Sequence, residues 1–299
     1  MEHIQDKVAF ITGGASGVGF GQAKVFSAAG ARVVLADIRQ DHLDQALADL
    51  HDQGAAAHGI KLDITDRAAY ARAADETERV FGPVQLLFNT AGVSVFGPLE
   101  KSTYADYDWM MGVNFGGVVN GIQTFVPRMI RHGKGGHIVN TASMAAFMAG
   151  GPAGIYSASK FAVRGLSEAL RRELEKYDIG VSVLCPANVN TNIFESARTR
   201  PEHLKETGYR IDAGVIESLR TLYSAGMDPE ELARHVLEGV KKNQLYIIPY
   251  PEVRAGLKAH FDAVLAALPP EDSDPEGVAK RQAAMAKWRD EVQKNAPKR

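Results

Sequence analysis

Seven short runs of apolar, β-prone residues alternate with longer helical patterns, and this alternation limits the possible folds more than any other feature. The side chains of these runs are nearly all apolar, without the polar alternation of a half-exposed strand. Such strands are typical of a parallel sheet with helices on both faces. We therefore predict an α/β fold with a doubly wound, parallel, seven-stranded sheet. The predicted strands are Val8 to Ile11, Arg32 to Ala36, Gly59 to Leu62, Gln85 to Phe88, His137 to Asn140, Val181 to Cys185 and Leu245 to Ile248.

Length and composition narrow the class of protein. At 299 residues and 45% hydrophobic composition, the chain can bury a substantial core. A formal net charge of -2, from 34 basic and 36 acidic residues, offers no footprint for nucleic acid or an anionic membrane. The single cysteine, Cys185, excludes an intrachain disulfide and a thiolate metal cluster. We interpret it as a small core residue.

The partner and compartment follow from the same features. We expect a small-molecule partner rather than a nucleic acid or a membrane. No stretch reaches the ~18 apolar residues of a membrane helix. The N-terminal apolar run, Val8 to Ile11, is too short for a secretory signal. We therefore expect a cytoplasmic protein.

The segment lengths predict one domain with two additions. Residues 1–250 contain the predicted sheet. Within them, residues 190–227 form an irregular, charge-rich insertion, and long loops of compact domains are often lids, so we expect this segment to cover a ligand. Residues 251–299 contain two helical patterns, Glu252 to Leu268 and Glu276 to Val292, punctuated by prolines. They are predicted to be a helical C-terminal extension of the same domain.

A glycine-rich turn follows the first predicted strand. Gly13, Gly17 and Gly19 have the spacing G-x-x-x-G-x-G, and a helical pattern begins there. Glycine permits a tight turn and lets the backbone approach a pyrophosphate, while a helix N-terminus offers unpaired N–H groups and a positive dipole end. The order strand, turn, helix and second strand favours a dinucleotide site over an ordinary turn.

Acidic residues end the second and third predicted strands. Asp37 lies eighteen residues after Gly19, where a carboxylate can accept hydrogen bonds from the adenosine ribose and repels a 2′-phosphate, so we predict NAD rather than NADP. Arg39 argues for NADP, because its guanidinium could hold that phosphate; we interpret it as a solvated residue at a helix start. Asp63 has two interpretations of equal weight, contact with the adenine or capping of the helix beginning near Asp66.

Tyr156 and Lys160 are four residues apart in a helical pattern, so their side chains project from one face. A free tyrosine titrates near ~10 and is a poor base at neutral pH. A neighbouring ammonium favours the phenolate, and bringing that pKa to about 7 requires roughly 4 kcal/mol of differential stabilisation. Surface pairs with this spacing are common, but the pair is a candidate for general acid–base catalysis.

Several motifs in a fixed order carry a family resemblance. Together they resemble the short-chain dehydrogenase/reductase family of nicotinamide-dependent oxidoreductases, over about residues 5 to 250. The resemblance implies a Rossmann-type fold, an NAD-binding catalytic domain at residues 1–250 and no metal. The motifs are Thr12-Gly13-x3-Gly17-x-Gly19, Asn89-Thr90-Ala91-Gly92, Asn114, Ser143 thirteen residues before Tyr156, and Tyr156-x3-Lys160.

The same resemblance implies a catalytic tetrad of Asn114, Ser143, Tyr156 and Lys160. Tyr156, as phenolate, would take the alcohol proton while Ser143 hydrogen-bonds the same oxygen. Lys160 would hold the phenolate and the nicotinamide ribose, and Asn114 would position a water that relays the proton outward. Taken singly, Ser143 could be only a small residue at a strand end and Asn114 a hydrogen-bonding residue inside a helix.

The chain departs from the family pattern at two places. Thr90 stands where the family has a second asparagine, and Ala187 stands where it usually has glycine, which puts a methyl group close to the nicotinamide. Val189 and Thr191 remain where a backbone and a hydroxyl could hold the carboxamide. The full set of cofactor contacts implied by the resemblance is Gly13, Ser16, Gly17, Val18, Gly19, Asp37, Asp63, Ile64, Asn89, Ala91, Gly92, Tyr156, Lys160, Pro186, Val189 and Thr191.

Residues that follow the strand ends form the predicted substrate pocket. Their aromatic rings and flexible thioethers suit a bulky aromatic or polycyclic alcohol better than a sugar. The predicted substrate-binding residues are Val93, Phe96, Ser143, Met144, Phe147, Tyr156 and Phe194.

Further phrases are similar to those of the bacterial Cα-dehydrogenases of lignin β-aryl ether breakdown. They are Phe96 to Lys101, Phe125 to Met129, Tyr246 to Arg254 and Asp274 to Gly277. This similarity implies NAD-dependent oxidation of the benzylic (Cα) secondary alcohol of β-O-4 linked aryl ethers to the ketone.

Two alternatives stay open. One is a dehydrogenase for another hydrophobic secondary alcohol, such as a hydroxysteroid. The other is a non-catalytic NAD(H)-sensing protein, which the intact tetrad disfavours. The family resemblance also implies a homodimer or homotetramer, paired through the helices beginning near Tyr104 and Tyr156.

Overall fold

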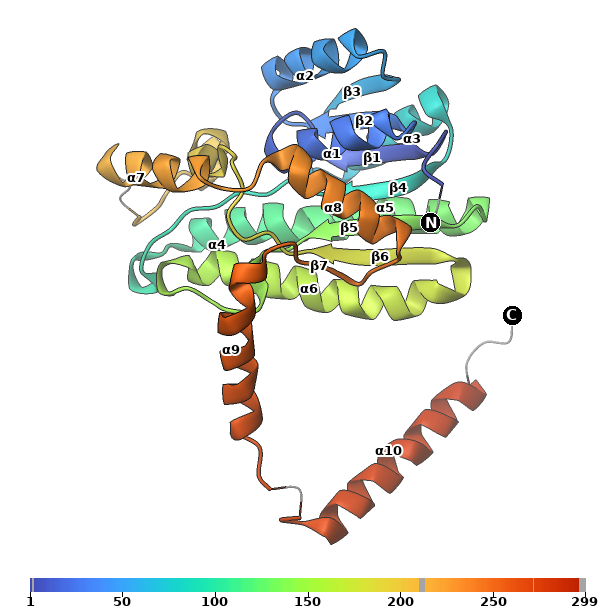
Figure 1. The fold of residues 1–299 in the computed structure, drawn as a ribbon, viewed down its shortest axis with the longest axis vertical. Coiled ribbons are helices and arrows are strands. Elements are labelled where there is room, and N and C mark those ends of the chain that lie inside the picture. Colours follow the sequence, from blue (N-terminus) through green and yellow to red (C-terminus); the bar gives the residue numbers. More distant parts are fainter. Residues whose placement is uncertain (2, 210–212, 271, 296–299) are drawn as a thin grey trace. The chain divides into compact units, whose positions relative to one another are not determined.

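The computed structural model describes residues 1, 3–209, 213–270 and 272–295. Its centre is a seven-stranded sheet in the order β3-β2-β1-β4-β5-β6-β7, in which every neighbouring pair is parallel (Figure 1). The predicted doubly wound, parallel α/β fold is confirmed. The strands are β1 (Val8–Thr12), β2 (Arg32–Asp37), β3 (Ala57–Lys61), β4 (Val84–Asn89), β5 (Gly136–Thr141), β6 (Ile179–Leu184) and β7 (Tyr246–Ile247).

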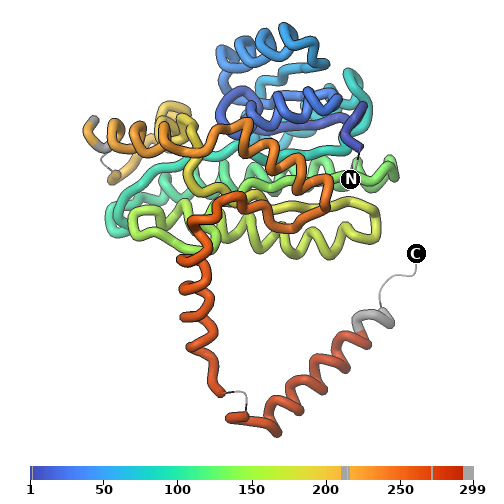
Figure 2. Tube along the Cα trace, in the orientation of Figure 1, coloured from blue at the N-terminus to red at the C-terminus, as the bar shows by residue number. Residues whose placement is uncertain are grey.

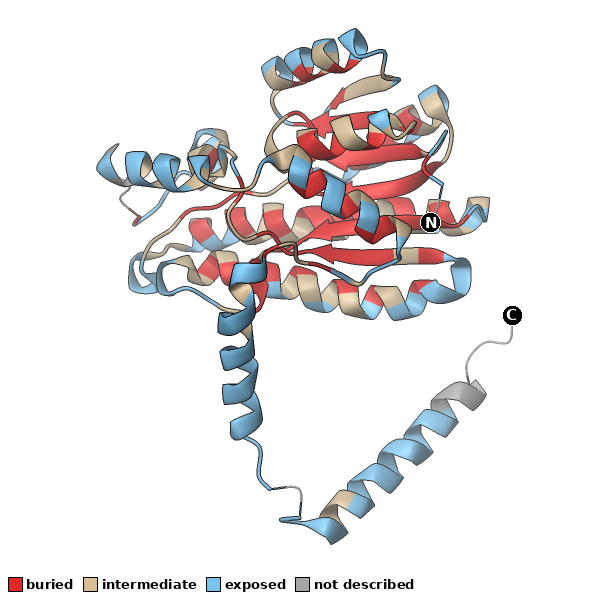
Figure 3. Cartoon of the chain, viewed as in Figure 1, coloured by how far each residue is buried: buried red, intermediate tan, exposed pale blue. Residues whose placement is uncertain are grey.

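Burial explains which strands the sequence predicts well. Every residue of β1, β4 and β5 is buried, which is why these strands read as unbroken apolar runs (Figure 3). The edge strands differ. In β3 only Ile60 is buried, and β7 has two residues. Their limits shift from the predicted ones because pairing with a single neighbour, and not local hydrophobicity, decides where an edge strand begins.

Helices cover both faces of the sheet (Figure 1). On one face α1 packs closely against α8. A Cβ on Gly21 of α1 would lie 2.4 Å from the carbonyl oxygen of Pro229, the first residue of α8, so this approach requires glycine. On the other face α3 packs against α5, and α6 lies along β6. The helices of this layer structure are α1 (Gly17–Ala28), α2 (Gln40–Asp52), α3 (Arg67–Phe81), α4 (Tyr104–Met111), α5 (Gly117–His132), α6 (Gly154–Leu174), α7 (Ala213–Ser224) and α8 (Pro229–Lys241).

The strand order reverses beside β1, which has β2 on one side and β4 on the other. The chain therefore leaves the carboxyl ends of β1 and β4 in opposite directions and opens a crevice between them. Ligands of open α/β sheets bind at such a switch point. The glycine-rich turn after β1 and the Asn89-Thr90-Ala91-Gly92 turn after β4 both begin there.

The segment between β6 and α8 has no strand of the sheet in its described part. It contains η6 (Ile193–Thr199), η7 (Glu202–Leu204) and α7 (Figure 2). Its two ends meet, because Val189 forms a parallel bridge with Met227 and the Asn190 N–H donates to the Met227 carbonyl at 3.0 Å. The segment is thus a closed excursion from the crevice edge of the sheet.

The chain divides into two compact units, Met1–Pro251 and Glu252–Arg299. The first contains the sheet. The second contains α9 (Arg254–Ala266) and α10 (Pro275–Asn295), where the sequence predicts helices. No described helix combines the length and apolar character needed to cross a membrane.

Candidate active site

A cavity of about 760 Å³ lies at the crevice where β1 and β4 end. It extends from the glycine-rich turn, past the carboxyl ends of β4 and β5, to the segment between β6 and α8. Most of the residues predicted from the sequence line it together, although they come from distant parts of the chain. These are Gly13, Ser16, Gly17, Val18, Gly19, Asp37, Asp63, Ile64, Ala91, Gly92, Val93, Phe96, Ser143, Met144, Tyr156, Lys160, Pro186, Val189 and Thr191.

Two glycines of the glycine-rich turn leave no room for a side chain. Gly13 has φ +63°, and a Cβ there would lie 2.9 Å from the Cα of Ala91 in the turn after β4. A Cβ on Gly19 would lie 2.1 Å from the carbonyl oxygen of Gly13. The backbone of the turn is therefore closely packed at these two glycines, and it leads into the N-terminus of α1 at the cavity, which fits the pyrophosphate of a dinucleotide.

The hydroxyl of Thr12 joins the two turns that flank the crevice. It accepts hydrogen bonds from the backbone N–H groups of Thr90 at 2.9 Å and Ala91 at 3.1 Å, and it donates to the Phe88 carbonyl at 3.3 Å. Thr12 is buried. This side chain thus holds the turn after β4 in register with the end of β1, which explains why a threonine precedes the glycines.

Asp37 lies at the predicted adenosine end of the cavity. One of its carboxylate oxygens accepts from the Ala15 N–H at 3.3 Å and the other from the Arg39 N–H at 3.0 Å. The Arg39 guanidinium pairs with Asp41, with its Nε 2.8 Å from Oδ1. Hydrogen bonding to Asp41 raises the pKa of Arg39. The guanidinium is thus already engaged by a neighbouring carboxylate.

Asp63 lines the cavity and does not cap α3. Its Oδ1 accepts from the Thr65 N–H at 2.9 Å and the Thr65 hydroxyl at 2.7 Å. The cap is Asp66, whose Oδ1 accepts from the Ala69 N–H at 2.9 Å. The interpretation of Asp63 as the helix cap is therefore wrong, because the residue directly before α3 takes that position.

Tyr156 and Lys160 lie on the first turns of α6 and both face the cavity. The Lys160 Nζ is 5.6 Å from the centre of the Tyr156 ring and donates to the Thr141 carbonyl, at the end of β5, at 3.0 Å. The Phe96 ring lies on another side of the phenol, with ring centres 6.4 Å apart. The phenol and the ammonium are thus held by a helix and a strand end, not by a loop.

Burial shifts the pKa values of Tyr156 and Lys160 in the directions that favour the neutral phenol and the neutral amine. It raises the pKa of Tyr156 to about 12, while a hydrogen bond with Ser143 acts in the opposite direction. It lowers the pKa of Lys160 to about 8. The lowered phenol pKa expected from the sequence is therefore wrong for the free protein, because burial penalises the phenolate. Perturbed, cavity-lining pairs of this kind are typical of catalytic sites.

Ser143 and Asn114 have different surroundings. The Ser143 hydroxyl accepts from the Ala145 N–H at 3.1 Å and donates to the Pro186 carbonyl at 3.4 Å. Asn114 is fully buried. Its Oδ1 accepts from the Val93 N–H at 2.8 Å, and its Nδ2 donates to the Val93 carbonyl at 3.0 Å and to the Ser159 hydroxyl at 3.1 Å. Ser143 thus reaches the cavity wall, whereas Asn114 joins the loop after β4 to α6.

A π-helical turn presents Asn114. The turn, η2 (Gly112–Gly116), interrupts the helix between α4 and α5. π-Helical turns inside α-helices often occur at functional sites. A Cβ on Gly92 would lie 3.2 Å from the Asn114 Oδ1 and 3.4 Å from the Lys160 Nζ, so these two side chains approach the same glycine. The π-turn therefore brings an amide to the back of the Lys160 site.

Four predicted site residues do not line this cavity. Asn89 and Asn114 are buried behind it, and Asn89 donates to the Asn140 side chain at 2.8 Å. Phe147 packs under the Arg164 guanidinium, 4.1 Å from its carbon. Phe194 stacks on Tyr223, with ring centres 5.8 Å apart, and lines a neighbouring cavity of about 440 Å³. Cys185 is fully buried, and burial raises the pKa of its thiol to about 12, as suits a core residue.

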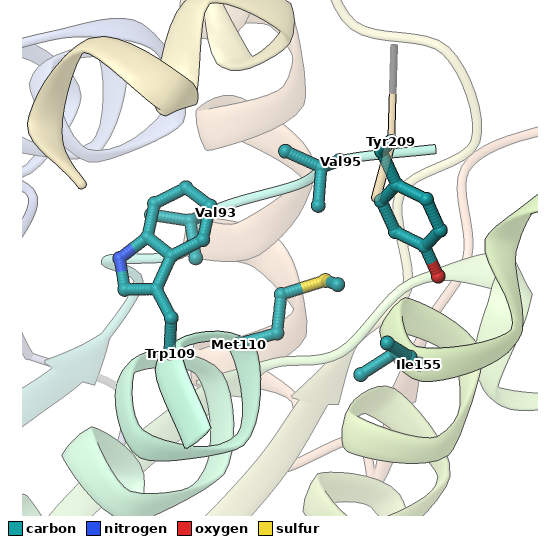
Figure 4. Close-up of a cluster of buried hydrophobic side chains, with 6 residues drawn as sticks. All are labelled: Val93, Val95, Trp109, Met110, Ile155 and Tyr209. Carbon is teal, nitrogen blue, oxygen red and sulfur yellow. The ribbon is translucent and has the colours of Figure 1, made fainter. Parts of the chain in front are cut away.

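Other lining residues were missed by the sequence interpretation. Trp109 and Val113 come from the helix before and within the π-turn, and His203, Leu204 and Tyr223 come from the segment after β6. Trp109 belongs to a buried cluster whose side chains pack between the loop after β4, α4 and α6 (Figure 4). In the sequence, only the position of Trp109, five residues before Asn114, could have indicated that Trp109 lines the cavity. The cluster contains Val93, Val95, Trp109, Met110, Ile155 and Tyr209.

Among the described residues, no three His, Cys, Asp or Glu side chains are grouped so that they could hold a metal ion. The polar groups of the cavity include a phenol, an ammonium, hydroxyls and carboxylates at separate places. Such a set can bind a dinucleotide at one end and move a proton at the other.

Comparisons with known proteins agree with this geometry. The family model described as short chain dehydrogenase matches residues 7–202. The chain is 54% identical to the C alpha-dehydrogenase of Sphingobium sp. strain SYK-6, over 96% of this chain and 95% of that protein. The apo form of LigD from the same strain has 51% identity and a TM-score of 0.76, covering 89% and 99% of the two chains. A short chain dehydrogenase/reductase from Burkholderia phymatum in complex with NAD has 33% identity and a TM-score of 0.85, covering 91% and 99%. The chain therefore belongs to the short-chain dehydrogenase family and is an oxidoreductase.

Proposed function

We propose that the protein oxidises the benzylic (Cα) secondary alcohol of lignin-derived β-O-4 aryl ethers to the ketone, with NAD as hydride acceptor. The observation that carries this proposal is the 54% identity, over nearly the whole of both chains, to a protein named C alpha-dehydrogenase. The match includes the C-terminal helices, because it covers 96% of this chain. Fold alone would support only an alcohol dehydrogenase of open substrate range.

The chemistry of the cavity wall supports an aromatic substrate. Beyond Tyr156, the wall includes Phe96, Trp109, Met144 and Met148. Aromatic rings and thioethers bind aryl groups through stacking and dispersion. A volume of about 760 Å³ suits a dinucleotide end plus a substrate larger than a short alcohol.

The cofactor preference rests on the adenosine end of the cavity. The carboxylate of Asp37 lies where ribose hydroxyls can donate to it, and its charge repels a 2′-phosphate. Arg39 pairs with Asp41, so its guanidinium is not free to bind a 2′-phosphate. When bound, NAD accepts the hydride released from the carbinol carbon. The glycine-rich turn, Thr191 and Lys160 would hold it.

The proposed roles of the reacting residues follow from their positions. Tyr156, as phenolate, accepts the proton of the substrate hydroxyl, so that the carbon–oxygen bond becomes a carbonyl as the hydride leaves. The Ser143 hydroxyl donates to that same oxygen. The Lys160 ammonium stabilises the phenolate and thereby opposes burial, which raises the pKa of Tyr156. Asn114, held by Val93, would order a proton-relay water beside Lys160.

We also propose that the protein acts in the cytoplasm as a homodimer or homotetramer. Exposed aromatic side chains on the two helices expected to pair support self-association. They are Tyr104 and Tyr107 on α4 and Phe161 on α6.

The substrate assignment predicts NADH formation from β-aryl ether alcohols. Purified protein is incubated with NAD and each stereoisomer of a guaiacylglycerol-β-guaiacyl ether, and absorbance of NADH is followed. We expect turnover of at least one isomer. The matched control is the same compound with its benzylic hydroxyl methylated, which keeps both rings but has no proton to give. Absence of turnover with every isomer rejects the assignment, and turnover of hydroxysteroids alone favours the other dehydrogenase.

The role of Asp37 predicts a change of cofactor preference. We expect Asp37→Ser to lower the ratio of kcat/KM for NAD to that for NADP by about 10- to 100-fold, because a charge-assisted hydrogen bond and a repulsion are both removed. Asp44→Asn, which neutralises an exposed carboxylate on α2, the helix that follows β2, is the matched control. An unchanged ratio in Asp37→Ser contradicts this role.

The role of Lys160 predicts a shift in pH dependence. Oxidation should accelerate as pH rises, since the phenolate is the base and burial places the pKa of Tyr156 at about 12 in the free protein. Lys160 has a pKa of about 8, so it is a cation that favours the phenolate mainly below that pH. Lys160→Ala should therefore lower kcat there and move its rise to higher pH. Lys176→Ala is the matched control, because Lys176 lies 5.0 Å from the ring of exposed Tyr177. Superimposable profiles for the wild type and Lys160→Ala would refute the role.

A further inference from the structure

The wall formed by residues 193–209 has little backbone support from the sheet domain. Its described backbone hydrogen bonds are local: the N–H groups of Glu195, Arg200, Leu204 and Lys205 donate to the carbonyls of Asn192, Ala197, Pro201 and Glu202. Yet Ile193, Ser196, Pro201, His203 and Leu204 line the main cavity from this segment. Side chains must therefore hold the wall in place.

The strongest of these attachments is a buried ion pair. The Arg200 Nη1 donates to the Asp106 Oδ1 at 2.6 Å, and the two side chains are 5% and 0% exposed. The other donors of Arg200 hold its own segment, since Nη2 donates to the Glu206 carbonyl at 2.8 Å and Nε donates to the Leu204 carbonyl. The Arg200 guanidinium thus binds two carbonyls of the turn at the end of η7 and connects this turn to α4.

Asp106 is itself fixed in α4. Its second oxygen accepts from the Thr103 N–H at 2.8 Å, in a capping box at the helix start. The Thr103 hydroxyl in turn donates to the Glu206 carbonyl at 2.9 Å. The Arg200 guanidinium carbon lies 5.1 Å from the centre of the Trp109 ring, which lines the cavity one turn further along α4. The ion pair therefore joins the wall to the helix that leads into the π-turn and Asn114.

The far end of the segment has an apolar attachment. The Tyr209 ring packs on Gly97, where a Cβ would lie 2.3 Å from the ring, and belongs to the cluster with Trp109 and Met110. Arg200 lies between η6 and this ring in the chain. Among the described residues of that stretch, it makes the ion pair with the rest of the domain. Without the pair, the middle of the wall would keep single hydrogen bonds, such as those of Ser196 with the Ser94 N–H, at 3.2 Å, and of Glu206 with the Thr103 hydroxyl, while its end stays packed.

We infer that the Asp106–Arg200 pair is a latch that holds residues 193–209 against α4 and thereby sets the fit of the part of the substrate beyond the reacting carbon. The inference rests on the proposed function for the identity of that part, the second aryl ring of a β-aryl ether. Asp106 and Arg200 are positioning residues, because they act through the wall and touch neither the phenol nor the ammonium. Cofactor binding at the glycine turn is independent of them.

The test compares Arg200→Met with the double variant Asp106→Asn/Arg200→Met. The single variant leaves a buried carboxylate without its partner, so its thermal unfolding midpoint should fall; the double variant removes both charges and keeps an oxygen for the capping box, so stability should recover. We expect KM for the two-ring ether to rise at least about tenfold in both variants, with KM for NAD and for a one-ring benzylic alcohol within about twofold. Glu202→Gln, which breaks an exposed pair with Lys205 in the same segment, is the matched control.

The outcomes separate a latch from a merely structural pair. If KM for the two-ring ether recovers together with stability in the double variant, or if KM for NAD rises in parallel, the inference is overturned. Should Arg200→Met fail to fold, the double variant decides alone.

A second readout does not depend on the substrate. Trypsin can cut after exposed Arg198 and Lys205, and it does not cut between Arg200 and Pro201, so these variants keep the same cleavage sites. We expect cleavage at these two sites, identified by mass spectrometry, to accelerate in the single and double variants but not in Glu202→Gln. Equal rates in all proteins overturn the latch. If the wild type oxidises another alcohol but no β-aryl ether, the proposed function fails while this measurement still tests the latch.

Discussion

The buried ammonium of Lys160 is the interaction on which the site depends. It is held by the Thr141 carbonyl at the end of β5, and it approaches Gly92 at the end of β4. Burial lowers its pKa to about 8 and raises that of Tyr156 to about 12. Burial therefore makes each charged form costly, and an opposite charge placed beside it offsets part of that cost. A phenol and an ammonium held together in this way can exchange a proton with a bound alcohol, which is what an alcohol dehydrogenase requires of its base.

Buried polar side chains hold the strand ends that carry this pair. Thr12 joins the ends of β1 and β4, and Asn114 joins the loop after β4 to α6. Asn89 and Asn140 connect β4 and β5, and the Asn140 Nδ2 continues to the Ser167 hydroxyl of α6 at 2.9 Å. Buried networks of this kind are stabilising only when every member is paired, so they specify one arrangement of the loops. Asn89 and Asn114 thus serve the cavity from behind its wall.

The sequence predicts the fold and the reacting groups well because both leave local signals. Unbroken apolar runs mark the buried strands, and the spacing of Tyr156 and Lys160 marks one helix face. It fails where position depends on distant segments. Phe147 and Phe194 were predicted to line the pocket because they follow lining residues. Instead, the Phe147 ring packs against Arg164 and the Phe194 ring stacks on Tyr223. Neither the π-turn at Asn114 nor the pairing of Arg200 with Asp106, ninety-four residues earlier, has a local signature.

Removal of one oxygen atom, in Tyr156→Phe, shows most directly whether the phenol is the base. The measurement is the turnover rate with any alcohol that the wild type oxidises, together with NADH affinity by fluorescence titration. We expect a fall of about 10²- to 10⁴-fold in kcat, with NADH affinity within about twofold, because the variant lacks only the proton acceptor. Tyr177→Phe, at an exposed phenol beside Lys176, should leave both quantities unchanged. A Tyr156→Phe protein with wild-type turnover would contradict the role of Tyr156 as the base that accepts the proton of the alcohol.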